Sequence, residues 1–172
     1  MDYLICLIKE VFVKDAEGMK RRLDVILHAF PTAIGPCQSV LWESFIRNVF
    51  RILVEGYASG RRCSNEGRAL MQLDFQQLVL KLESLTGLRP LPATDRDYVD
   101  SYIKAYYLPE TQLEQWLLHS KAYSKKQLLS VLNVATHVSK RTRQRLTALL
   151  DEGGLQTTLA PSQAITIEAV AH

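Results

Sequence analysis

An almost continuous apolar surface on one helical segment constrains the fold of this chain more than any other feature. Over residues 39–58, charged residues recur at every fourth position, as Glu43, Arg47, Arg51 and Glu55. Most positions between them hold large apolar side chains, namely Leu41, Trp42, Phe45, Ile46, Val49, Phe50, Ile52 and Leu53. This spacing predicts a helix with a narrow polar stripe, which needs neighbours on most of its sides. We therefore expect it to lie inside a bundle.

The first half of the chain predicts two further helices around this one. Apolar residues three and four apart predict a helix over residues 2–30, with a kink or break at Gly18. Its expected inner face holds Leu4, Ile8, Val11, Met19, Leu23, Ile26 and Phe30, and Pro31, Gly35 and Pro36 are expected to end it. A third helix is expected from the N-cap Ser64 to the stop at Gly87, with Leu70, Leu73 and Leu80 as a second apolar flank.

Cap residues predict four shorter helices in the second half. We expect Thr94 to cap a fourth helix and Pro109 to occupy the first position of a fifth. Ser124 and Gln127 have the spacing of a capping box, and Ser139 is expected to cap a last helix that ends at Gly153-Gly154.

These elements predict an all-α fold, an elongated bundle of about seven helices. The alternation of apolar and polar residues that marks strands is missing before residue 153. We expect one helical domain over residues 1–152 and a disordered tail over residues 153–172, which is weakly periodic. The first residues do not form a signal peptide, and no segment has the roughly 20 apolar residues of a membrane-spanning helix.

The sequence does not predict an enzyme, a metal site or a cofactor site. His28, His119, His137 and His172 are scattered and have no cysteine or carboxylate at ligand spacing. Cys63 follows two arginines, but no general base accompanies it. We expect the three cysteines to be reduced thiols and the protein to be cytoplasmic.

One candidate partner-binding site surrounds two glycines that interrupt strongly helical sequence. It comprises Glu55, Gly56 and Tyr57, followed by Ser64, Asn65, Glu66, Gly67 and Arg68. Glycine permits close approach of another backbone, either from a partner or from a neighbouring helix of the same domain. The internal helix crossing is the favoured alternative of the two.

A second candidate site is basic. Between Glu114 and Asp151 the chain has no acidic residue, and the basic residues there include Lys125, Lys126, Lys140, Arg141, Arg143 and Arg145. A solvated helix end is the simplest interpretation, and the alternatives are an acidic surface of a partner protein or an anionic membrane or phosphoinositide surface. Nucleic acid is not expected as a partner, because aromatic stacking residues and a reading motif are missing.

Several segments resemble the C-terminal domain family of syndetin. They are VEGYA at 54–58, CSNEGRALMQLDFQQ at 63–77, YV at 98–99, YIKAYYL at 102–108 and YSKKQL at 123–128, in the same order as in that family. The resemblance covers residues 41–151, and the segment 63–77 is long enough to be specific.

The resemblance implies the C-terminal piece of a larger, non-catalytic vesicle-tethering subunit. Syndetin is the distinctive subunit of the endosome-associated recycling protein complex, which shares its other subunits with the Golgi-associated retrograde complex. The implied partners are those shared subunits and SNAREs, and the implied process is endocytic recycling with endosomal retrograde transport. The implied location is peripheral, on recycling endosomes and the trans-Golgi network.

Overall fold

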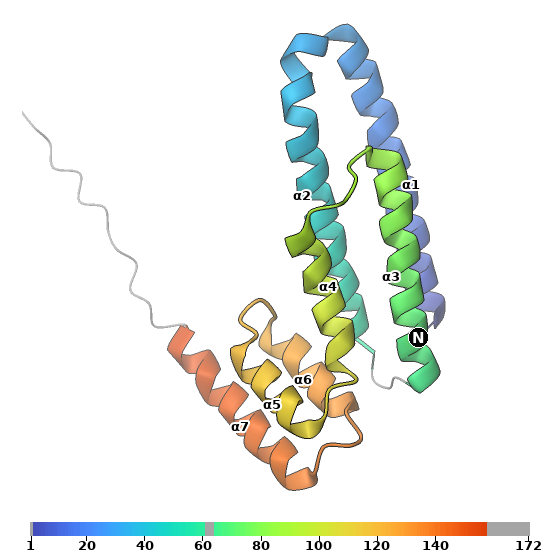
Figure 1. Cartoon of the computed structure of the whole chain (residues 1–172). Helices are drawn as coiled ribbons and strands as arrows, with labels where there is room; N and C mark the ends of the chain where they lie inside the picture. The colour runs from blue at the N-terminus through green and yellow to red at the C-terminus, as the bar shows by residue number, and fades with distance from the viewer. Residues whose placement is uncertain (1, 61–63, 158–172) are drawn as a thin grey trace, which may run out of the picture.

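The computed structural model describes residues 2–60 and 64–157, which form seven helices and no strand (Figure 1). Side chains are described for residues 10–30, 37–60, 64 and 66–151. The helices are α1 (Asp2–Ala29), α2 (Pro31–Ala58), α3 (Asn65–Thr86), α4 (Ala93–Ala105), α5 (Glu110–His119), α6 (Lys125–Val134) and α7 (Lys140–Thr157). The predicted all-α fold of about seven helices is confirmed.

The first four helices form an elongated bundle. α1 and α3 run in one direction, and α2 and α4 run in the other (Figure 1). α1 contacts α2 and α3, and α4 contacts the same two helices from the opposite side (Figure 1). The inner faces of α2 and α3 fill the centre of this bundle with the buried side chains Trp42, Ile46, Val49, Phe50, Leu53, Met71, Phe75, Leu78 and Leu82. The nearly all-round apolar α2 therefore lies in the bundle as its sequence predicts.

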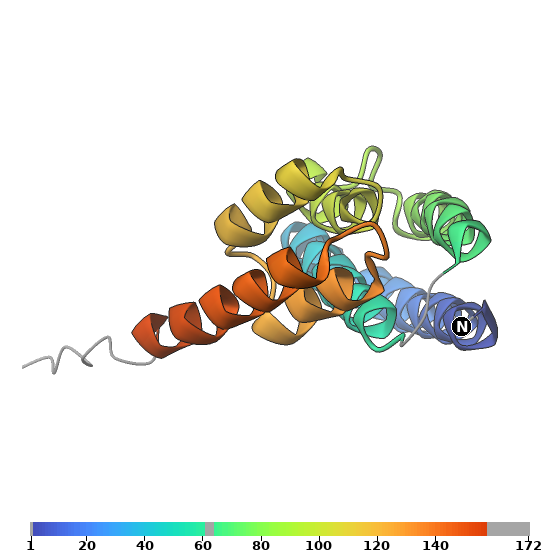
Figure 2. The same cartoon turned by 90° about the horizontal axis from the view of Figure 1, so that it is seen from below.

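The last three helices form a compact cap at the end of the bundle where α2 and α4 finish. α6 contacts α2 and α7, and α7 extends away from the bundle axis (Figure 2). An aromatic cluster joins this cap to α4. Tyr98 and Tyr123 stack with ring centroids 4.8 Å apart, and Trp116 lies 5.1 Å from Tyr123. Tyr123 also donates a hydrogen bond of 2.7 Å to the Tyr98 carbonyl, so the cluster fixes the position of α6.

Local cap signals are confirmed at four helix ends. The Ser64 hydroxyl accepts a hydrogen bond from the Gly67 N–H at 3.1 Å, and Gly87 ends α3 with a positive φ of 75°. Ser124 and Gln127 form the predicted capping box of α6. The Ser139 hydroxyl accepts from the Thr142 N–H at 3.1 Å, as expected of a cap for α7.

The predicted bounds of α1 and the predicted end of α2 are confirmed, but the break expected at Gly18 and the predicted start of α2 are wrong. Helix α1 is continuous through Gly18, where a Cβ would meet nothing within 4 Å. Only Phe30 separates α1 from α2, and α2 begins at Pro31 instead of near Ser39. Proline is tolerated at the first position of a helix because that residue has no helical N–H bond to lose. The first turns of α2 lie across the end of the hairpin before the helix runs back (Figure 1), as expected where Pro36 interrupts the backbone hydrogen bonds.

Three other predicted boundaries differ from the structure. Helix α4 begins at Ala93 with Pro92 as its N-cap, so Thr94 does not cap it. Pro109 is the N-cap of α5 and not its first residue. Helix α7 continues through Gly153-Gly154 to Thr157, because glycine in a helix costs only about 1 kcal/mol relative to alanine. The remainder of the expected tail, residues 158–172, lies outside the described residues.

Candidate partner-binding site between α2 and α6

Glu55 joins the two candidate sites of the sequence, because it contacts α6 from the last turns of α2. Its carboxylate pairs with the Lys126 ammonium and accepts a hydrogen bond of 3.1 Å from the Gln127 side-chain amide. These residues are 71 and 72 positions apart in the chain. The hydrogen bond from Lys126 is the main cause that holds the pKa of Glu55 below its usual value.

Gln127 is the buried centre of this junction. Its side-chain oxygen accepts from the Ser124 N–H at 2.8 Å while its side-chain amide donates to Glu55. Its backbone carbonyl accepts a hydrogen bond of 3.0 Å from the hydroxyl of Tyr102 on α4. One residue thus connects α2, α4 and α6. The spacing of Ser124 and Gln127 predicts the cap of α6, but no sequence pattern predicts the contact with Glu55.

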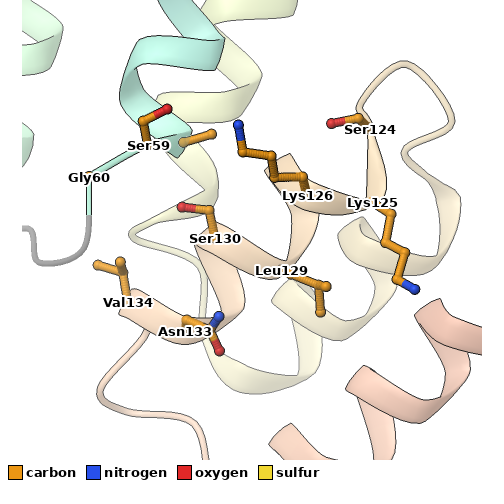
Figure 3. A pocket seen from close by; sticks show the side chains of 10 residues that line it. Ser59, Gly60, Ser124, Lys125, Lys126, Leu129, Ser130, Asn133 and Val134 are labelled. Atoms are coloured by element: carbon orange, nitrogen blue, oxygen red, sulfur yellow. The ribbon is translucent and has the colours of Figure 1, made fainter.

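An open groove lies beside this junction, between the end of α2 and the outer face of α6 (Figure 3). It has a volume of about 730 Å³ and an apolar floor of Ala58, Leu129 and Val134. Its other described lining residues are Ser59, Gly60, Ser124, Lys125, Lys126, Ser130 and Asn133. The two lysines are the only charged residues among them. Sequence patterns did not identify Ser59, Ser130 or Asn133, because the groove forms only when α2 and α6 meet.

Tyr57 and Arg68 lie inside the domain and hold helices together. The buried Tyr57 hydroxyl donates to the Met71 carbonyl at 3.3 Å, and burial raises the pKa of Tyr57 well above its usual value. The buried Arg68 guanidinium donates to the Tyr106 carbonyl at 3.0 Å and lies 5.8 Å from the ring centroid of Tyr107. For these two residues, the structure shows the internal crossing of α2, α3 and α4 that was the favoured alternative.

The other residues of the first candidate site lie where α2 ends and α3 begins. Gly56 and Gly67 are half-buried, whereas Ser64 and Glu66 are exposed. A backbone hydrogen bond, followed by one from the Ser64 hydroxyl, lowers the pKa of Glu66. The side chain of Asn65 and all of residues 61–63, including Cys63, lie outside the described part of the chain.

The six residues of the basic candidate site do not gather on one surface. Lys126 pairs with Glu55 on α2, Lys125 with Asp151 at 2.5 Å, and Arg145 with Glu114 at 2.6 Å. The half-buried Arg143 donates to the Ala135 carbonyl at 2.7 Å. Lys140 and Arg141 are exposed, and no described residue forms an ion pair with either.

The described residues contain no group of three or more His, Cys, Asp or Glu residues placed to bind a metal ion. His119 and His137 each contact a backbone carbonyl, of Gln115 at 2.7 Å and of Leu108 at 2.8 Å. Within the part of the chain that was described, no helix is long and apolar enough to cross a membrane.

Comparison with known proteins gives one family. Residues 10–151 match the family model described as "Syndetin, C-terminal". The chain is 46% identical over 145 residues to syndetin of Mus musculus, 45% identical over 145 residues to that of Rattus norvegicus, and 45% identical over 144 residues to that of Gallus gallus. These matches cover 81–83% of this chain but only 15% of each relative. No solved structure matches it.

Proposed function

Because this chain belongs to the syndetin family, whose C-terminal domain it spans, we propose that it is a non-catalytic protein-interaction domain of a vesicle-tethering subunit. The observation that supports this most strongly is the family match over residues 10–151. The elongated helical bundle agrees with it, since stacked helices present long surfaces to partners without requiring a catalytic centre.

We place the domain in endocytic recycling from endosomes to the plasma membrane and in endosomal retrograde transport. Its partners in this proposal are subunits shared between the recycling and retrograde tethering complexes, together with SNAREs. The proposal rests on the family, since the chain spans about 15% of the length of the syndetins that it matches.

The groove between α2 and α6 is the surface that we propose for a protein partner. It is open, it has an apolar floor, and its only described charged lining residues are Lys125 and Lys126. Apolar surface supplies binding free energy, whereas the lysines favour a segment that carries acidic residues beside its apolar ones. Both lysines form ion pairs that are largely exposed, and such pairs contribute at most about 1 kcal/mol, so an acidic partner can replace their present contacts.

Affinity capture from cell lysate tests this proposal with a matched pair of variants. Leu129→Arg places a charge on the groove floor, and Leu118→Arg places the same charge on the exposed face of α5. The unmodified domain and Leu118→Arg should recover tether subunits or endosomal SNAREs, and Leu129→Arg should lose them. If the folded, unmodified domain recovers neither class, the proposed function is wrong. Equal recovery by both variants would remove the groove but leave the function.

A further inference from the structure

The end of the α1–α2 hairpin is exposed and free of formal charge. Leu23 on α1 and Trp42 on α2 are the last buried residues before it. Between them, after Asp24, lie residues 25–41, which we name the hairpin tip; none of its described side chains is buried. From Val25 to Trp42 the sequence contains no Asp, Glu, Lys or Arg. This segment was not singled out by its sequence, because its apolar residues have the helical spacing of an inner face.

Large apolar side chains are exposed on the hairpin tip. Val25 is 71% exposed, Phe30 62% and Val40 64%, and Ile26 and Leu41 are also exposed. The expected inner face of α1 is therefore wrong at Ile26 and Phe30, since α3 and α4 do not reach this end of the bundle (Figure 1). Large exposed apolar residues from both helices thus gather at one end of the bundle, and such clustering is typical of an interaction site.

Charged residues of both signs flank the tip: Asp24 and Glu43 lie directly beside the uncharged segment, and Arg21 and Arg22 lie up to one turn further along α1. Arg21 and Arg22 are exposed and form no ion pair with a described residue, whereas Asp24 pairs with Lys20 at 3.2 Å. With Glu43, which is half-buried, the five residues that flank the tip carry three positive and two negative charges. Arg22 lies one helical turn before Val25 and Ile26, so it shares their face of α1.

We propose that the hairpin tip inserts into the interfacial layer of an anionic lipid bilayer. The tip is a convex end and not a groove, so it does not surround a partner helix. From Leu23 to Ala29 the helix rises by six residues, which is about 9 Å at 1.5 Å per residue. Interfacial helices bury their apolar face by roughly 5–10 Å, and a bilayer disfavours charge at that depth while basic residues just outside it bind anionic headgroups. The uncharged tip and the exposed Arg21 and Arg22 match these requirements.

This membrane contact lies at the opposite end of the molecule from the groove between α2 and α6 (Figure 1). It also differs from the basic end of the chain, where most of the candidate cations are engaged within the domain. A domain with a lipid contact at one end and a protein contact at the other would hold its partner away from the membrane.

Flotation of the chain with lipid vesicles tests the proposal. We expect the protein to float with phosphatidylcholine vesicles that contain about 30% phosphatidylserine, and to float less with pure phosphatidylcholine. Phe30→Glu with Val40→Glu should weaken binding at least roughly tenfold, because two charges would enter the interfacial layer. The matched control is Leu73→Glu with Leu80→Glu, which changes exposed leucines of α3 and should float like the unmodified chain.

Cys37 provides a second readout, because it is exposed on the hairpin tip. In a chain with Cys6→Ser and Cys63→Ser, an environment-sensitive fluorophore on Cys37 should shift its emission to the blue when anionic vesicles are added. A lack of flotation, or flotation that the tip variant does not change, would overturn the proposal. It would also be overturned if Lys140→Glu with Arg141→Glu alone abolished binding, or if the chain were a dimer that the tip variant dissociates.

Discussion

Replacing Gln127 by alanine should destabilise the junction between α2 and α6 by about 2 kcal/mol. The side chain is buried and forms two hydrogen bonds, accepting from the Ser124 N–H at 2.8 Å and donating to the Glu55 carboxylate at 3.1 Å. An intramolecular hydrogen bond contributes about 1 kcal/mol to the free energy of unfolding. The loss at Glu55 is limited, because its side chain is 42% exposed and water replaces the lost donor. The lost bond to the Ser124 N–H also breaks the capping box of α6, so it accounts for the larger part of the change.

Urea unfolding measures this change with two internal fluorophores. Trp42 reports on the bundle and Trp116 on the cap, so variants with one tryptophan follow each part separately. The control is Gln112→Ala on α5, which removes an exposed amide and should leave the free energy of unfolding within about 0.5 kcal/mol of the original. If Gln127→Ala matched this control, Gln127 would not connect α2 to α6 as described.

Three further predictions concern residues of α2 and α4. Tyr102→Phe should lower the free energy of unfolding by about 1 kcal/mol, because the Gln127 carbonyl loses its buried donor. Tyr107→Phe, at an exposed ring, should have almost no effect. Equal effects of the two substitutions would contradict the burial of Tyr102. Ile46→Ala should cost about 2–5 kcal/mol by opening a cavity in the bundle, and a smaller loss in a thermal or urea melt would place Ile46 outside the core. The lowered pKa of Glu55 stabilises the fold above the pKa of the unfolded chain, and this stability is lost as the pH falls through the folded value. Glu55→Gln should therefore flatten the acid limb of a stability–pH curve by a small amount, since the pair with Lys126 is largely exposed, and an unchanged curve would mean that the ion pair contributes nothing.

Features that depend only on residues close together in the sequence could be predicted. The Ser124–Gln127 capping box and the Gly87 stop are set by short-range geometry, and both are confirmed. The packing of most of the apolar surface of α2 inside the bundle follows from its composition, although Leu41 and Ile52 remain exposed. Pro31 follows the end of α1 as predicted, but it also begins α2, because at the first helical position a proline loses no hydrogen bond.

Features that depend on packing could not be predicted. Glu55 and Lys126 belong to separate candidate sites in the sequence, and only the approach of α6 to α2 joins them. Periodicity identifies an apolar face but not how far its neighbours extend, so Ile26 and Phe30 have core spacing and yet lie beyond the ends of α3 and α4. On α7, Arg145 pairs with Glu114 of α5 and Arg143 donates to the Ala135 carbonyl, and neither contact follows from the basic segment alone.

We propose that the groove between α2 and α6 binds a protein of the recycling or retrograde tethering machinery. The most direct test of this claim is a photo-crosslinking residue at Asn133, in the groove, compared with one at Thr111, on the exposed surface of α5. In cells, the Asn133 position should give a crosslinked product that contains a tether subunit or an endosomal SNARE, and the Thr111 position should not. The same products from both positions, or a groove product that contains neither class of protein, would contradict the claim.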